Sequence, residues 1–184
     1  MLPHFFDTPG SDVLGRAAAI RLLVLDVDGV LTDGTVYYGA DGEMLKGFSI
    51  LDGLGIRLLL DAGIEVAIIS ARDSAPLRRR AADLGITRLS LGRHDKKAAW
   101  QTLLKETSLP REQAAFVGDD LIDLQILGQA GLSVTVPNGH PLLLERCHWQ
   151  TRNAGGHGAV REVCELILAA QGLLDQALRS YLDE

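Results

Sequence analysis

The chain has 184 residues, of which 47% are hydrophobic and 23% are charged, and its net charge is -6. Such a composition predicts one globular domain with a proper core, and it excludes a mainly disordered protein. The acidic balance argues against a nucleic-acid partner, because phosphate backbones are bound by clustered Lys and Arg. The one basic cluster, at residues 78–80, is interpreted as a solvated helix face.

No segment predicts export or a membrane partner. Residues 1–10 lack a basic region followed by an apolar run, so no signal peptide is expected. The longest apolar stretches are far shorter than the roughly 20 residues that span a bilayer. Cys147 and Cys164 lack CxxC spacing and are predicted to be reduced residues, not a disulfide or a zinc site. The expected location is the cytoplasm.

The first third of the chain predicts a strand followed by a hairpin. Residues 1–19 are expected to form a loose lead-in with a short helix at most. Residues 21–27 are a continuous apolar run that ends in acid and glycine, which is typical of a buried parallel strand. Two β-prone runs, 35–38 and 43–48, flank an Asp-Gly turn and predict a β-hairpin. We assign this hairpin to an insertion at 33–49, which is too small to be a separate domain.

From residue 52 onwards, predicted helices and strands alternate. The helices are expected at 52–61, 74–84, 95–107, 121–130 and 160–170, and the strands at 64–69, 87–90, 114–117 and 132–136. This alternation predicts an α/β fold, with a Rossmann-like parallel sheet sandwiched by helices in one domain that spans 1–184. A polar C-terminal tail is expected at 172–184.

Polar groups follow several of the predicted strands. They are Asp26, Asp28, Ser70, Lys96, Asp119, Asp120 and Asp123. Because ligands of open α/β sheets bind beyond the carboxyl ends of the strands, these groups are expected to meet at one edge. Crowded carboxylates repel one another, and a cation such as Mg²⁺ removes that conflict. A carboxylate can also attack phosphorus, so the pattern indicates metal-assisted phosphoryl transfer through an aspartyl-phosphate.

The same residues resemble the four motifs of the haloacid-dehalogenase-like phosphatases, in order and in placement. The motifs are Asp26-x-Asp28-Gly-Val-x-Thr-Asp, Ser70, Lys96 and Gly118-Asp-Asp-x-x-Asp123. From about residue 20 to residue 171, the chain is most similar to the branch that hydrolyses 3-deoxy-D-manno-octulosonate 8-phosphate in lipopolysaccharide inner-core synthesis. The hairpin and the Gly155-Gly156 segment carry the likeness to this branch.

The resemblance implies a role for each motif residue. Asp26 would be the nucleophile and a Mg²⁺ ligand. Asp28 would be the general acid and base, with its backbone carbonyl on the metal, and Asp119 would be the third protein ligand. Ser70 and Lys96 would bind the transferring phosphoryl group. Lys97 is the rival of Lys96, and the spacing after Gly92 favours Lys96.

Three further acidic or basic residues have less defined implied roles. Asp120 and Asp123 are candidates for orienting the site or its bound waters. Arg72 stands where the family has an arginine that meets the substrate. The family has Thr-Gly-Arg where this chain has Ser70-Ala71-Arg72, and alanine restricts the backbone, which leaves the direction of Arg72 open.

The resemblance also implies a homotetramer without a large cap domain. The hairpin at 33–49 would form a barrel with strands of other subunits, so that a neighbour covers each active site. Residues 152–161 resemble a tail that reaches a neighbouring site, where glycines would let the backbone approach an anionic sugar. Arg80 is a weaker candidate for contact with a neighbour or with the sugar carboxylate.

Several functions are therefore compared. The first is hydrolysis of a small phosphorylated eight-carbon keto sugar acid, and the second is the same reaction on a nine-carbon acid. The third is a non-catalytic oligomerising module of the same fold, which the presence of every motif residue disfavours. A response-regulator-like phosphoacceptor is disfavoured by Asp28, because a second acid can deprotonate the hydrolytic water.

Overall fold

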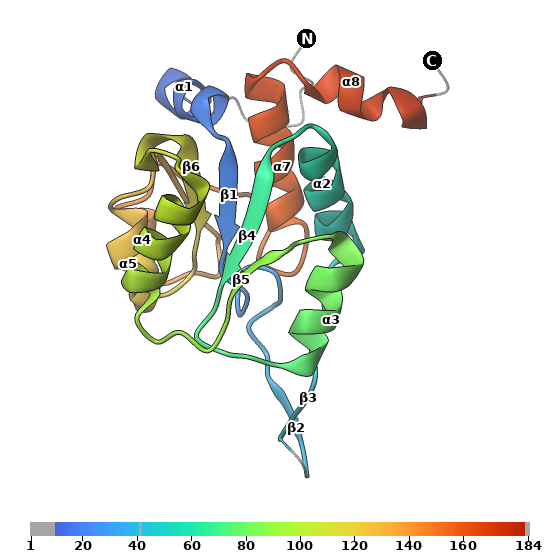
Figure 1. The fold of residues 1–184 in the computed structure, drawn as a ribbon, viewed down its shortest axis with the longest axis vertical. Helices are drawn as coiled ribbons and strands as arrows, with labels where there is room; N and C mark the ends of the chain where they lie inside the picture. The colour runs from blue at the N-terminus through green and yellow to red at the C-terminus, as the bar shows by residue number, and fades with distance from the viewer. Residues whose placement is uncertain (1–9, 41, 183–184) are drawn as a thin grey trace.

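The computed structural model describes residues 10–40 and 42–182, and it contains a six-stranded parallel sheet between two layers of helices (Figure 1). The order in the sheet is β5-β4-β1-β6-β7-β8. The strands are β1 (Leu22–Leu25), β4 (Glu65–Ile69), β5 (Arg88–Ser90), β6 (Ala114–Val117), β7 (Leu132–Thr135) and β8 (Trp149–Gln150). The predicted α/β fold is confirmed.

Each face of the sheet carries its own apolar core, because successive side chains of a strand point to opposite faces. The helices are α1 (Ser11–Ala19), α2 (Ile50–Asp61), α3 (Ala75–Leu84), α4 (Lys96–Thr107), α5 (Leu124–Leu127) and α7 (Ala159–Ala170). Leu23 and Leu25 pack with residues of α1, α2, α3 and α7, whereas Leu22 and Val24 pack with residues of α4 and α5. All four residues of β1 are buried, which explains its unbroken apolar sequence.

Local sequence signals set several helix ends. The Asp95 carboxylate accepts a hydrogen bond from the Ala98 N–H and caps the N-terminus of α4. Helix α3 ends at Gly85, whose φ of 80° closes the helix in the left-handed region. The helix expected at 121–130 is shorter, since a 3₁₀ turn over Leu121–Asp123 precedes α5.

Among the α-helices and strands of the described residues, three short ones were not predicted. These are α6 (Pro141–Leu144), the edge strand β8 and α8 (Leu174–Leu178), which lies within the expected tail. The short helix expected near the start is α1, while residues 1–9 lie outside the described part. Within residues 10–40 and 42–182, no helix combines the length and apolar character needed to cross a bilayer.

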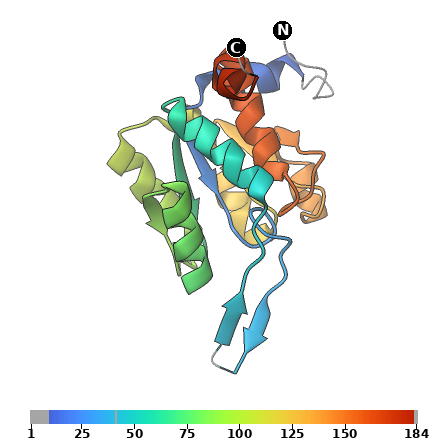
Figure 2. The same cartoon turned by 90° about the vertical axis from the view of Figure 1, so that its right-hand side faces the viewer.

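The predicted hairpin is confirmed and stands apart from the main sheet. It consists of β2 (Tyr37–Gly39) and β3 (Gly42–Leu45), paired antiparallel with an irregular register between Tyr37 and Tyr38. Both views show it projecting from the end of the molecule opposite α8 (Figures 1 and 2). It therefore extends from the edge of the sheet to which β1 points.

Candidate active site

The groups predicted to meet do follow the carboxyl ends of neighbouring strands. Asp26 comes directly after β1, and Ser70 directly after β4. Lys96 is the first residue of α4, which follows β5, and Asp119 lies two residues after β6. Since these strands are parallel neighbours, the fold brings the four residues to a single edge.

Three carboxylates form the centre of this edge. Asp26, Asp119 and Asp123 each offer an oxygen, and these oxygens all lie within 4.8 Å of one another. The Lys96 ammonium lies 2.8 Å from Asp26 Oδ1 and 2.8 Å from Asp123 Oδ1, and its side chain is only 2% exposed. Lys97, by contrast, is exposed. The structure thus places Lys96, rather than its neighbour, among the carboxylates.

Asp123 also organises the loop that carries Asp119. Its Oδ2 accepts hydrogen bonds from the N–H groups of Asp119, at 3.2 Å, and Asp120, at 3.3 Å. The Asp120 carboxylate points back to its own turn and accepts from the Leu121 N–H at 2.7 Å. Asp123 is therefore inside the carboxylate cluster, while the Asp120 side chain is an exposed cap of the 3₁₀ turn.

The crowding changes the proton affinity of two of these acids. Burial, followed by the charge of Asp123, raises the pKa of Asp26 to about 6, although Lys96 opposes the shift. Burial and the charge of Asp26 raise the pKa of Asp119 to about 8. One ammonium does not balance three carboxylates, and their oxygens are the hard donors that Mg²⁺ prefers. The donor set therefore fits a Mg²⁺ ion.

The stability of the metal-free protein is expected to fall as pH rises from about 4 to about 8. In this window, folded Asp26 and Asp119 retain protons that the unfolded chain has released, because both pKa values are raised on folding. Mg²⁺ requires the deprotonated carboxylates, so it should raise the thermal midpoint more at about pH 8 than at about pH 5. Thermal melts at both pH values, with Mg²⁺ or with EDTA, measure this difference in the thermal midpoint. An increase by Mg²⁺ that is the same at both pH values would contradict the prediction.

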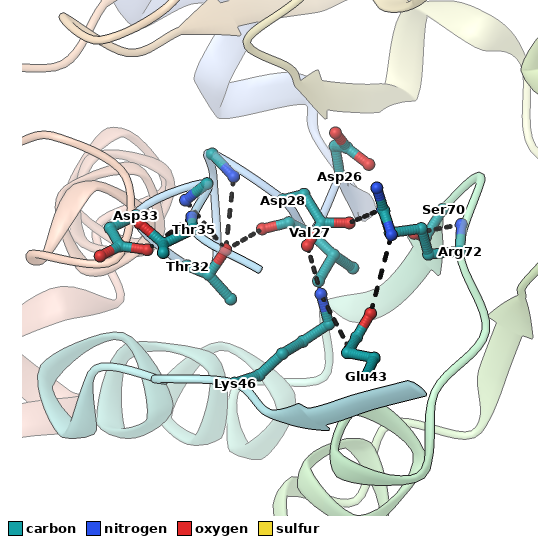
Figure 3. A network of polar contacts seen from close by, with 12 residues as sticks. Asp26, Val27, Asp28, Thr32, Asp33, Thr35, Glu43, Lys46, Ser70 and Arg72 are labelled. Atoms are coloured by element: carbon teal, nitrogen blue, oxygen red, sulfur yellow. Dashed lines mark hydrogen bonds and ion pairs between the residues drawn. The ribbon is translucent and has the colours of Figure 1, made fainter. Parts of the chain in front are cut away.

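The Asp28 carboxylate faces Lys46 of the hairpin and Arg72 (Figure 3), and it is not one of the three clustered carboxylates. Its Oδ1 is ion-paired with Lys46, and its Oδ2 lies 3.6 Å from Arg72 Nε. Arg72 also donates a hydrogen bond to the Tyr38 hydroxyl at 3.2 Å and lies 3.9 Å from Glu43. Ala71 in place of the family glycine therefore does not turn Arg72 away from the site.

Sequence reasoning missed Lys46 and Glu43 as parts of this site. Both belong to the hairpin, which the sequence linked to assembly and not to Asp28. Ser70, which was predicted, is buried, and its Oγ accepts from the Arg72 N–H at 3.1 Å. This contact fixes the loop after β4.

The loop after β1 is held by a third residue that sequence reasoning missed, Asn138. The Asn138 side chain donates to the Gly29 carbonyl at 3.0 Å and accepts from the Gly155 N–H at 2.8 Å. The Gly156 N–H donates to the Val30 carbonyl at 2.9 Å. A Cβ on Gly155 would lie 1.7 Å from the Gly29 carbonyl oxygen, so only glycine fits there. The sequence analysis assigned no role to Asn138.

Residues 152–161 are expected to reach a neighbouring site. Within the chain itself, Gly155 and Gly156 pack on the loop after β1, and the contact with another subunit stays a prediction. His157, in the same segment, is an exposed loop residue.

The basic cluster at 78–80 is confirmed as a helix face with local partners. Arg78 pairs with Asp73, and Arg79 pairs with Asp83. Arg80 donates to the Ser49 carbonyl at 2.9 Å and lies over the Phe48 ring. Arg80 therefore connects α3 to the start of α2, which gives it a structural role within its own chain.

Comparisons with known proteins agree with this geometry. A family model described as haloacid dehalogenase-like hydrolase matches residues 85–163. The 3-deoxy-D-manno-octulosonate 8-phosphate phosphatase of Escherichia coli K12 is 52% identical over 91% of this chain and 89% of its own length. The enzyme of that name from Yersinia pestis is 53% identical over 90% of this chain and 89% of its own length.

Solved structures show the same relationship. The crystal structure of the Yersinia pestis phosphatase has a TM-score of 0.88 and covers 90% of this chain and 89% of its own. The phosphatase of Moraxella catarrhalis, solved with a magnesium ion, a phosphate ion and a KDO molecule, is 40% identical with a TM-score of 0.90, and the match covers 92% of this chain and 98% of that one. The chain belongs to the haloacid dehalogenase-like hydrolases and, within them, to the family of the 3-deoxy-D-manno-octulosonate 8-phosphate phosphatases.

Proposed function

We propose that this chain hydrolyses 3-deoxy-D-manno-octulosonate 8-phosphate to 3-deoxy-D-manno-octulosonate and phosphate, as a Mg²⁺-dependent phosphomonoesterase of lipopolysaccharide inner-core biosynthesis. One observation carries the proposal: the carboxylates of Asp26, Asp119 and Asp123 lie within 4.8 Å of one another around Lys96. The named activity of relatives that are 52% identical supports the substrate.

In the first half of the reaction, Asp26 takes up the phosphoryl group. A carboxylate oxygen of Asp26 attacks phosphorus and forms an O–P bond, while the ester P–O bond breaks. The electron pair of that bond goes to the sugar oxygen, which takes a proton from Asp28. Lys96 and Ser70 hold the phosphoryl oxygens, and Arg72 contacts the substrate.

In the second half, water releases the phosphate. Asp28 accepts a proton from the water, whose oxygen attacks phosphorus. The bond between Asp26 and phosphorus breaks, and its electron pair restores the carboxylate. Asp26, Asp119 and the Asp28 backbone carbonyl would hold Mg²⁺, which would supply positive charge to offset the phosphoryl oxygens. Asp123 keeps the Asp119 loop and Lys96 in place.

We further propose that the chain forms a homotetramer through the hairpin. Tyr37, Tyr38, Met44 and Leu45 are all exposed on the two-stranded ribbon. An isolated two-stranded hairpin is at best marginally stable in water, and an exposed apolar patch on it is typical of an interaction surface. Sedimentation velocity, compared with a Tyr38→Ser, Met44→Ser double variant, tests this, and an unchanged assembly in the variant would contradict it.

The cytoplasm is the proposed compartment. Cys147 and Cys164 are both free, which suits a reducing environment. Burial raises the pKa of the Cys147 thiol to about 12, so this side chain stays an unreactive thiol at neutral pH.

A phosphate-release screen tests the proposed activity. The purified protein is given a panel of sugar phosphates, including eight-carbon and nine-carbon keto acid phosphates, with Mg²⁺ or with EDTA. We expect a sharp preference for the eight-carbon substrate and no release in EDTA. A preference for the nine-carbon keto acid phosphate would show that the proposed eight-carbon substrate is wrong. No phosphate release from any ester would support the non-catalytic module.

A further inference from the structure

Lys46 differs from its neighbours in the hairpin. It lies one residue after β3, at the base of the ribbon, and its side chain is 0% exposed. Nearby, Met44 and Leu45 are exposed. An apolar ribbon that leaves its hydrophobic side chains in water but buries an ammonium reverses the usual pattern. The burial of this ammonium therefore requires a specific explanation.

The explanation lies in two carboxylates. The Lys46 ammonium donates a hydrogen bond to Asp28 Oδ1 and lies 3.3 Å from Glu43 Oε1. Glu43 Oε1 is buried and accepts no hydrogen bond from any described residue, so Asp28 is the hydrogen-bonding partner. A buried ammonium is costly unless it is paired, which ties the position of the hairpin base to that of Asp28.

The carboxylate of Asp28 is held by contacts on the side of the site that faces the hairpin. Lys46 contacts its Oδ1, and Arg72 Nε lies 3.6 Å from its Oδ2 (Figure 3). The cluster of Asp26, Asp119 and Asp123 does not include Asp28. A general acid must lie within hydrogen-bond reach of the leaving oxygen, and small displacements lower its effect strongly. The residue that orients Asp28 therefore affects the protonation of the leaving group.

We propose that Lys46 is a positioning residue of the phosphatase reaction, which orients the Asp28 carboxylate from the base of the hairpin of the same chain. The inference rests on the proposed function. It assigns the hairpin a part in each chain's own chemistry, in addition to assembly. Lys46 acts on leaving-group departure and not on substrate affinity.

The test compares two substrates that differ in their need for a general acid. The sugar phosphate leaves as an alkoxide and needs a proton, whereas p-nitrophenyl phosphate leaves as a stable phenolate. We expect Lys46→Met to lower kcat for the sugar phosphate by about 10- to 100-fold, with KM unchanged, and to change kcat for p-nitrophenyl phosphate by less than about 3-fold. Lys46→Arg should recover part of the loss. Lys97→Met, which removes an exposed charge beside the site, should behave as the wild type.

Each other outcome overturns the inference. Equal losses of kcat on both substrates would overturn the assignment to leaving-group departure, because hydrolysis of the phosphoaspartate, in which Asp28 also acts, is common to both substrates. A change in KM alone would make Lys46 a binding residue. Wild-type behaviour of Lys46→Met would remove any role. The p-nitrophenyl phosphate activity also reports that the variant is folded. If the wild type hydrolysed neither substrate, the proposed function would fail instead, and this result is distinct from the others.

Discussion

Asp26→Asn is expected to lower phosphate release by at least about 10⁴-fold with saturating Mg²⁺ and substrate. The amide has the size of the carboxylate but does not form the acyl phosphate. Lys96 keeps Asp123 as a partner at 2.8 Å, so the fold should survive. Steady-state phosphate release measures the loss, and a thermal melt reports the fold.

The matched control for this substitution is Asp83→Asn. Asp83 is an exposed acid that pairs with Arg79 on α3, away from the carboxyl edge of the sheet. Its removal should leave turnover unchanged. If Asp26→Asn released phosphate at a rate close to that of the wild type, the nucleophile would have to be another group.

Lys96→Met is expected to lower the free energy of unfolding of the metal-free protein by about 3–5 kcal/mol. The substitution leaves Asp26 and Asp123 buried without the ammonium that contacts both. Because Asp119 adds a third carboxylate within 4.8 Å, repulsion among them increases. Urea denaturation in EDTA measures the effect, and Mg²⁺ should recover part of the lost stability.

Two variants sharpen this measurement. Lys97→Met removes the adjacent exposed charge and should change the free energy of unfolding by less than about 0.5 kcal/mol. Adding Asp123→Asn to Lys96→Met removes one of the stranded charges, so the double variant should be more stable than Lys96→Met alone. Equal stabilities of Lys96→Met and Lys97→Met would show that the Lys96 ion pairs contribute little.

The core and the strand-end groups could be predicted because both follow from local patterns. The apolar run of β1 requires a sheet covered on both faces, and a parallel strand places the next residue, Asp26, at the carboxyl edge. The same reasoning located Ser70 and Asp119. The preference for Lys96 over Lys97 also agrees with the structure, since the first residue of α4 points into the site.

What could not be predicted depends on contacts between distant segments. Lys46 reads as one more charge in a short ribbon, and only the fold shows that it reaches Asp28. Strand β8 has two residues and no pattern of its own, and it forms because β7 offers it an edge. The roles of the motif residues stay predictions until the variants are measured.

The strap formed by Asn138, Gly155 and Gly156 has a consequence for the order of events during synthesis. The loop after β1 leaves the ribosome early. The residues that hydrogen-bond to its carbonyl groups, Asn138 and Gly156, are synthesised more than half a chain later. Growing chains tend to fold from the N-terminus, so a partial product can contain Asp26 and Asp28 while their loop is still unsupported. Catalytic competence should therefore arise in one late step, when the strap has been translated and has closed on the loop.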